Sequence, residues 1–183
     1  LTNISILSNL SKKNLLQPQK AGDFLQRISE EVSSSSQALD DIIWSVNSNH
    51  DTLEETVARM GRFPTQLFDS ANISYELFLD PAFEGRRLSM EQRRDLYLLY
   101  KEAVNNISKH AAAGHVTIQI AVEHNQLLLS VKDDGRGFDS GRESTRHGLK
   151  GMKLRVKRWR GKILIESGPG RGTFIQVMLP VSR

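Results

Sequence analysis

The stretch KEAVNNISKHA, Lys101–Ala111, carries a carboxylate, two amides, a lysine and a histidine within a pattern that is typical of a helix. Glu102 and Asn106 are four residues apart, so a helix presents them on one face. Lys109 and His110 follow about one turn later. Either this is a solvated polar face, or its oxygen atoms are presented to a cation such as Mg²⁺. The choice depends on whether the rest of the chain supplies a phosphate site.

Glycine clusters further along the chain favour such a site. DDGRGF, Asp133–Phe138, ends a predicted strand, where glycines let the backbone approach a ligand and an aspartate can accept a hydrogen bond from adenine. HGLKGM, His147–Met152, opens a predicted helix whose free N–H groups suit phosphate. GPGRGT, Gly168–Thr173, also fits a simple hairpin turn. Each cluster alone fits an ordinary turn or loop, but their order after Asn106 indicates one nucleotide site, with Ser140–Arg146 predicted to close over it as a lid.

Composition limits the classes of protein that fit. The chain has 183 residues, of which 38% are hydrophobic and 25% charged, and it contains no cysteine. This is typical of a globular domain without disulfides or thiolate metal sites. No apolar run is long enough for a membrane span, and no signal peptide is visible. The net charge is +4, and basic residues gather in Lys153–Lys162. That run fits a solvated helix face, polyphosphate attraction or an acidic partner, whereas no aromatic platform or zinc-finger spacing supports nucleic-acid binding.

Residues 1–48 are predicted to form a helical hairpin. Gln17–Asp23 joins a short helix to a longer one, with Pro18 suited to a helix start. The longer helix repeats a seam at alternating spacings of three and four residues, at Leu25, Ile28, Val32, Ser35, Leu39, Ile42 and Val46. One hairpin cannot bury both of its faces, so the sequence predicts a homodimer through this hairpin. Packing against a neighbouring domain of the same chain is the alternative.

Residues 49–183 are predicted to form a second domain. Asp51 and Glu54 resemble a capping box, and the helix that they open is expected to bend or stop at Phe63–Pro64. A second capping box, Ser89 with Gln92, opens a long helix to about Ala112. Alternating apolar residues predict strands, which are Ile73–Leu79, Val116–Glu123, Gln126–Asp133, Ile163–Ser167 and Phe174–Pro180. Helices over a mostly antiparallel sheet predict an α+β fold, a two-layer α/β sandwich.

The quoted motifs resemble those of a known family. EAVNNISKH, DDGRGF, HGLKGM and GRGT are similar to the N, G1, G2 and following Gly-Thr boxes of the GHKL ATPase superfamily, which has the Bergerat fold. The segment from about Thr52 to Pro180 resembles the catalytic domain of bacterial sensor histidine kinases. QALDDIIWSVN, Gln37–Asn47, resembles the end of the dimerisation hairpin of the nitrate sensors and membrane-fluidity sensors. The resemblance implies that the parent phosphorylates a histidine and relays the phosphoryl group to a response regulator receiver domain.

The resemblance also implies cofactors, site residues and a location. The cofactors are ATP and Mg²⁺, with Asn106 as the metal ligand and Glu102 as the acidic residue one turn before it. Lys109, which can neutralise phosphate charge, is predicted together with Glu102 to be catalytic. Whether Glu102 acts as a base or positions a metal-bound water stays open. The implied cofactor-binding residues are Asn106, His110, Asp133, Gly135, Gly137, Gly148, Leu149, Gly151, Met152 and Thr173. The implied location is cytoplasmic, with any anchor in the bacterial inner membrane carried by other parts of the parent.

One departure from the family pattern concerns the phosphoacceptor. The family's acceptor histidine lies in the first hairpin helix, but no histidine here precedes His50. Because the chain starts at Leu1 within a helical pattern, we expect the acceptor to lie upstream and this segment to bind ATP without phosphorylating itself. A parent without an acceptor is the alternative. Two other functions fit the motifs less well: a GHKL-type ATPase clamp, and a non-catalytic dimerisation module with a vestigial ATP site.

Overall fold

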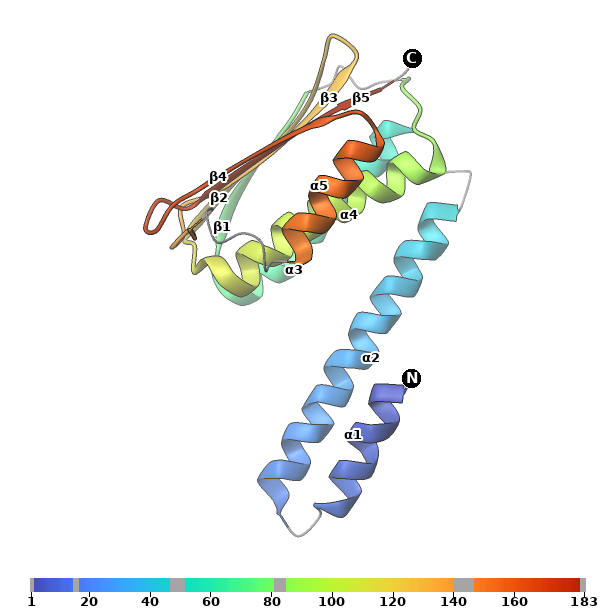
Figure 1. Cartoon of the computed structure of the whole chain (residues 1–183), viewed down its shortest axis with the longest axis vertical. Coiled ribbons are helices and arrows are strands. Elements are labelled where there is room, and N and C mark those ends of the chain that lie inside the picture. The colour runs from blue at the N-terminus through green and yellow to red at the C-terminus, as the bar shows by residue number, and fades with distance from the viewer. Residues whose placement is uncertain (1, 15–16, 47–51, 81–84, 140–146, 182–183) are drawn as a thin grey trace. The chain divides into compact units, whose positions relative to one another are not determined.

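The chain folds into two compact units, Leu1–Val46 and Asn47–Arg183 (Figure 1). The computed structural model describes residues 2–14, 17–46, 52–80, 85–139 and 147–181. The predicted domain boundary between residues 48 and 49, His50, Asp51 and the predicted lid at 140–146 lie outside these residues. In the part of the chain that is described, no helix is both long enough and apolar enough to cross a membrane.

The first unit is the predicted helical hairpin. It consists of α1, Thr2–Lys13, and α2, Pro18–Val46. Helix α2 begins at Pro18, so the joining segment is shorter than the sequence predicted. Ser11 and Ala21 are buried where the helices meet, and the Ser11 hydroxyl donates to the Ala21 carbonyl oxygen at 3.4 Å. Small side chains at this point let the two backbones approach each other closely.

The second unit is an α+β sandwich, as predicted. Its elements are α3 (Leu53–Ala71), β1 (Ser74–Leu79), α4 (Met90–Asn106), the π-helical turn η3 (Ile107–Ala111), β2 (His115–Glu123), β3 (Gln126–Asp133), α5 (His147–Arg158), β4 (Lys162–Ser167) and β5 (Thr173–Pro180). The strand order is β1-β2-β3-β5-β4, with β1 parallel to β2 and every other pair antiparallel. Helices α3, α4 and α5 cover one face of this sheet (Figure 1).

Alternation along the strands decides which residues face the helices. The buried series on β3 runs Leu127, Leu129, Val131 and then Asp133. On β5 the buried series runs Leu179, Val177 and Ile175 and continues to the half-buried Thr173. Because side chains alternate with a period of two, the last member of each series points to the same face as the apolar ones. Asp133 and Thr173 are partners in the register. The fold therefore places a polar pair at one end of an apolar face.

Two predictions about α3 need correction. The N-cap is Thr52, whose side chain accepts a hydrogen bond from the Glu55 N–H at 3.4 Å, so the helix begins one residue later than predicted. Of the predicted bend or stop at Phe63–Pro64, the stop is wrong, because α3 continues through Pro64 to Ala71. A proline removes one helical hydrogen bond. The turn beyond Pro64 buries Phe68 completely, and that burial outweighs the lost bond.

The capping box at the start of α4 is confirmed. The Ser89 hydroxyl accepts a hydrogen bond from the Gln92 N–H at 3.2 Å, and the Gln92 side chain accepts one from the Ser89 N–H at 3.0 Å. The far end of this helix differs from the prediction. The last turn, Ile107–Ala111, is π-helical and ends at Ala112, which has a positive φ of 50°.

Candidate functional site

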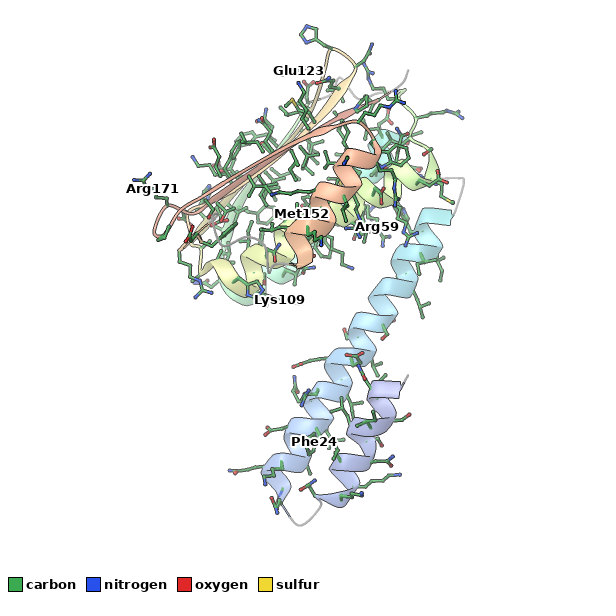
Figure 2. The ribbon with its side chains drawn as sticks, in the orientation of Figure 1. Phe24, Arg59, Lys109, Glu123, Met152 and Arg171 are labelled. Carbon is green, nitrogen blue, oxygen red and sulfur yellow. The ribbon has the colours of Figure 1, made fainter. Side chains whose placement is uncertain are left out.

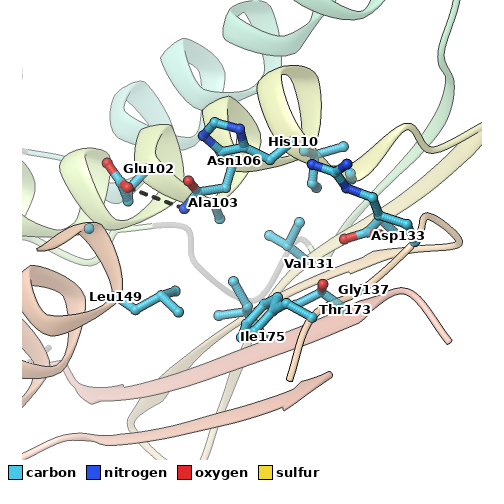
Figure 3. A pocket seen from close by; sticks show the side chains of 15 residues that line it. Glu102, Ala103, Asn106, His110, Val131, Asp133, Gly137, Leu149, Thr173 and Ile175 are labelled. Atoms are coloured by element: carbon cyan, nitrogen blue, oxygen red, sulfur yellow. Dashed lines mark hydrogen bonds between the residues drawn. The ribbon is translucent and has the colours of Figure 1, made fainter. Parts of the chain in front are cut away.

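A cavity of about 430 Å³ lies between the α4–η3 helix and the helix-covered face of the sheet (Figure 3). Helix α5 closes one side of it. The residues that line it are Glu102, Ala103, Asn106, Ile107, His110, Ala111, Val131, Asp133, Arg136, Gly137, Phe138, Gly148, Leu149, Thr173 and Ile175. The cavity thus has an aliphatic middle, with a buried carboxylate at one end and a carboxylate–amide pair at the other.

Asp133 forms the buried end of the cavity. Its residue surface is only 4% exposed, and its carboxylate accepts a hydrogen bond from the Gly135 N–H at 2.9 Å. Burial raises the pKa of Asp133, while hydrogen bonds from Gly135 and Thr173 oppose that rise. A carboxylate in this poorly hydrated place can select a hydrogen-bond donor on a ligand.

The neighbouring Asp134 has a different task. It is exposed, and one of its oxygens accepts hydrogen bonds from the Gly114 and His115 N–H groups, both at 2.9 Å. These bonds, with the His115 bond the largest cause, lower the pKa of Asp134. Asp134 thus fixes the loop that enters β2, and only Asp133 of the pair lines the cavity.

Glycines are required at the Asp133 end of the cavity, because a side chain there would clash with neighbouring backbone atoms. A Cβ on Gly135 would press on the Ala111 carbonyl and lie 2.9 Å from its carbon atom. Gly137 has a positive φ of 59°, and a Cβ there would press on the Gly168 carbonyl and lie 2.7 Å from the Gly172 carbonyl oxygen. The segment from Asp133 is therefore clamped between η3 and the 168–172 turn, which also explains why the Gly-rich turn belongs to the site.

Glu102 and Asn106 form the other end. The Asn106 amide nitrogen donates to a Glu102 carboxylate oxygen at 3.2 Å (Figure 3). This bond fixes the amide, so its oxygen is the atom that remains to bind a cation. Gly148, at the start of α5, has no room for a side chain here, because a Cβ would overlap the Glu102 carboxylate and lie 2.7 Å from its carbon.

The π-helical turn explains why His110 joins this wall. In a continuous α-helix a residue eight positions after Glu102 is rotated by about 80° from it. A π turn closes its hydrogen bonds at the fifth residue and advances each side chain by a smaller angle. His110 therefore lines the cavity with Glu102 and Asn106 (Figure 3). Single π turns occur frequently at functional sites.

The structure brings together most, but not all, of the predicted site residues. Glu102, Asn106, His110, Asp133, Gly137, Gly148, Leu149 and Thr173 line the cavity, and Gly135 packs directly behind it. Lys109 is exposed (Figure 2) and is not part of the wall. Gly151 does not line the cavity either. Met152 is buried in the core.

Sequence reasoning missed the aliphatic middle and two residues of the Gly-rich segment. Val131 and Ile175 lie two residues from Asp133 and Thr173 on the same strand faces, so the alternation of β3 and β5 already marked them. Arg136 and Phe138 also line the cavity and lie within DDGRGF, in which only Asp133 and the glycines were predicted to bind the nucleotide. Among the described residues, no group of three or more His, Asp or Glu side chains could hold a metal by itself.

Comparisons with known proteins agree with this geometry. The family model described as "Histidine kinase-, DNA gyrase B-, and HSP90-like ATPase" matches residues 91–183. DegS of Bacillus subtilis, a signal transduction histidine-protein kinase/phosphatase, is 35% identical over 103 residues, which are 54% of this chain and 27% of DegS. UhpB of Salmonella typhimurium, which carries the same description, is 37% identical over 102 residues, 56% of this chain and 20% of UhpB. The chain thus spans about a quarter of the length of DegS and less of UhpB.

Solved structures show the same fold. The histidine kinase AdeS of Acinetobacter baumannii has a TM-score of 0.66 at 16% identity, covering 100% of this chain and 96% of that one. The histidine kinase domain of the blue-light activated kinase of Erythrobacter litoralis EL346 has a TM-score of 0.64 at 17% identity, covering 98% and 93%. The family match extends over just over half of the 183 residues and contains every predicted site residue. The chain belongs to the family of histidine kinase-, DNA gyrase B- and HSP90-like ATPases.

Proposed function

We propose that this chain is the ATP-binding catalytic core of a two-component sensor histidine kinase. It binds ATP with Mg²⁺ for transfer of the γ-phosphoryl group to a histidine, from which a response regulator receiver domain takes it. The carrying observation is one cavity that joins the buried Asp133 carboxylate to the Glu102–Asn106 pair. The end of α2 supports the subfamily of nitrate and membrane-fluidity sensors through its QALDDIIWSVN sequence. The segment acts on the cytoplasmic side.

The cavity fits a nucleotide. Its volume of about 430 Å³ falls in the usual range of small-molecule sites. Asp133 offers an acceptor for the exocyclic amine of adenine, and Val131 with Ile175 offers an apolar surface to the base. Gly148 lies at the start of α5, where the free N–H groups of a helix suit phosphates. Thr173 supports Asp133 through hydrogen bonds.

The residues at the other end fit Mg²⁺ together with phosphates. Asn106 would supply an amide oxygen, and Glu102 would hold that amide in place and accept a hydrogen bond from a metal-bound water. Magnesium usually takes few protein ligands and completes its shell with water and substrate phosphates. When bound, the ion would neutralise phosphate charge for transfer. Lys109 and Gly151 do not line this cavity, so we assign them no direct contact with the nucleotide.

Calorimetry with a nonhydrolysable ATP analogue, with and without Mg²⁺, tests the nucleotide site. We expect tight binding that depends on Mg²⁺, and we expect Asn106→Ala to remove that dependence while adenosine still binds. Asn105→Ala is the matched control, because Asn105 is the adjacent asparagine and does not line the cavity. Equal effects of the two substitutions, or no binding by the unaltered protein, would contradict the proposal.

A labelling experiment tests the kinase part of the proposal. None of the five histidines lies in α1 or α2, so this segment should bind γ-labelled ATP without acquiring acid-labile label. In the full-length protein, label should appear and should require Asn106. Acid-labile label on the segment itself, for which His50 is the first candidate, would overturn the expectation that the acceptor lies elsewhere. Release of phosphate without any labelled protein would favour an ATPase.

The hairpin supports a homodimer. Leu25, Val32, Leu39, Ile42 and Ile43 of α2 are between 48% and 67% exposed within the described chain. These residues repeat along one helix, and a second copy would cover them. Light scattering should give twice the monomer mass. Leu39→Asp should shift the protein towards monomer, because it places a charge in a desolvated seam, whereas Ser33→Asp, which falls outside the seam, should not. A monomer at high concentration would refute the dimer.

A further inference from the structure

A buried carboxylate outside the cavity, about two helical turns from Glu102, joins α5 to α4. Asp95, on α4, is 5% exposed. One of its oxygens accepts hydrogen bonds from the Trp159 indole N–H at 2.9 Å and from an Arg158 Nη at 3.1 Å. The Arg155 Nε lies 3.6 Å from its other oxygen. All three donors belong to α5 or to the residue that follows it, so these contacts of Asp95 connect α4 to the C-terminal end of α5.

The contacts of Asp95 with Arg155, Arg158 and Trp159, here called the clamp, account for part of the basic run Lys153–Lys162. Arg155 and Arg158 direct their charge to Asp95. Trp159 is held as well, because its ring borders a small cavity of about 10 Å³ together with Leu96 of α4 and Leu179 of β5. Trp159 therefore connects Asp95 to the core of the sandwich, and charge-assisted hydrogen bonds to a buried carboxylate fix geometry.

Helix α5 touches α4 at a second point, which is in the cavity. There Gly148 lies against the Glu102 carboxylate. Asp95 and Glu102 are seven residues apart on α4, and Arg155 and Gly148 are seven residues apart on α5. Two antiparallel helices thus meet at two points about 10 Å apart along their axes. Figure 1 shows α5 beside α4.

We infer that Asp95 is a positioning residue that sets where α5 lies along α4 and thereby holds Gly148 and Leu149 in the cavity wall. This inference rests on the proposed function, because it takes ATP as the ligand. Asp95 does not line the cavity, so its influence passes through the helix. A helix that slid or tilted would carry Gly148 away from Glu102 and would change the wall where the phosphates lie.

The effect is confined to one end of the cavity. Helix α5 contributes Gly148 and Leu149 to the wall, near Glu102. The Asp133 end is built from β3, β5 and η3, which are joined by the β3–β5 pairing and by the hydrogen bond from the Arg136 N–H to the Ala111 carbonyl oxygen. None of these bonds involves α5. A loosened clamp therefore weakens contacts to phosphates and leaves contacts to the base unchanged.

The experiment compares ATP–Mg²⁺ with adenosine as ligands of the Asp95→Ala variant. Residues that couple to a site through packed contacts typically change its binding severalfold, so we expect ATP affinity to fall roughly three- to thirtyfold. Adenosine affinity should stay within about twofold of the unaltered protein. Asp69→Ala is the matched control, because Asp69 is an exposed aspartate on α3 and should change neither ligand.

Arg158→Met provides a second variant should Asp95→Ala not fold. It removes one donor whose side chain is 64% exposed, and it should give the same ATP-selective loss in a smaller amount. Amide hydrogen exchange without nucleotide should also become faster in α5 than in β3. Equal losses for ATP and adenosine would show general destabilisation and would overturn the inference, as would unchanged affinity for both. An unaltered protein that binds no nucleotide would refute the proposed function instead, while faster exchange in α5 would still support the clamp.

Discussion

Replacing Gly137 with alanine should destabilise the second unit, because the added Cβ would clash with backbone carbonyl groups. Gly170 provides a control for this prediction. Gly137 has a φ of 59°, and a Cβ there would press on the Gly168 carbonyl oxygen and lie 2.7 Å from the Gly172 carbonyl oxygen. Gly170 in the same region also has a positive φ, 73°, but nothing lies within 4 Å of its added Cβ. Both variants carry the conformational penalty, and only one carries the clash.

The magnitudes follow from these two terms. A left-handed conformation costs a non-glycine residue about 1–2 kcal/mol, so Gly170→Ala should lose about that much unfolding free energy. Forcing a methyl group into a packed place costs typically about 1–3 kcal/mol more. Gly137→Ala should therefore lose roughly 2–5 kcal/mol. The atoms in the way are backbone carbonyls, which cannot rotate aside as a side chain can.

Urea unfolding followed by tryptophan fluorescence measures both losses. Nucleotide affinity should also fall in Gly137→Ala, because the clash pushes apart the two glycine-rich segments that flank Asp133, and it should be little changed in Gly170→Ala. Equal losses of unfolding free energy in the two variants would show that the segments around Gly137 give way freely. The argument that these glycines are required by space would then be refuted.

Three further substitutions test other parts of the structure. The Tyr100 hydroxyl is buried without a hydrogen-bond partner in the described part of the chain, so Tyr100→Phe should raise the free energy of unfolding by about 1 kcal/mol in urea titrations; a loss would reveal a bound water or another partner. Burial raises the pKa of Asp133 in the folded protein above its ordinary value of 3.8. The protonated form is therefore favoured on folding, and the free energy of unfolding falls as pH rises from 3.8 through the folded pKa. Asp133→Asn should therefore gain stability relative to the unaltered protein across this window and lose selectivity for adenine over guanine, and a stability difference that does not vary with pH would contradict the reasoning. An added Cβ at Gly151 would meet only the end of the Arg155 side chain at 3.1 Å, so Gly151→Ala should stabilise α5 by about 0.5–1 kcal/mol in thermal unfolding; a loss would mean that the helix cannot accept even that contact.

Local signals in the sequence sufficed for the strands, the Ser89 capping box and the glycine segments. Strand alternation and capping depend on residues within a few positions of each other, which is why those predictions agree with the structure. The pair Glu102 and Asn106 also follows from the period of one helix. Even the apolar wall at Val131 and Ile175 was present in the alternation, since it continues directly into Asp133 and Thr173.

Contacts between distant segments decided the rest. The continuation of α3 through Pro64 depends on burial of Phe68 against other elements, and the π-helical turn that brings His110 to the cavity has no local signal in the chain. Lys109, Gly151 and Met152 share motifs with wall residues, but packing turned the first outward, left the second beside the cavity and placed the third in the core. The clamp at Asp95 joins residues sixty or more positions apart. The periodicity of the sequence shows which residues share one face of a helix or strand. Only the packing of the elements shows what that face contacts.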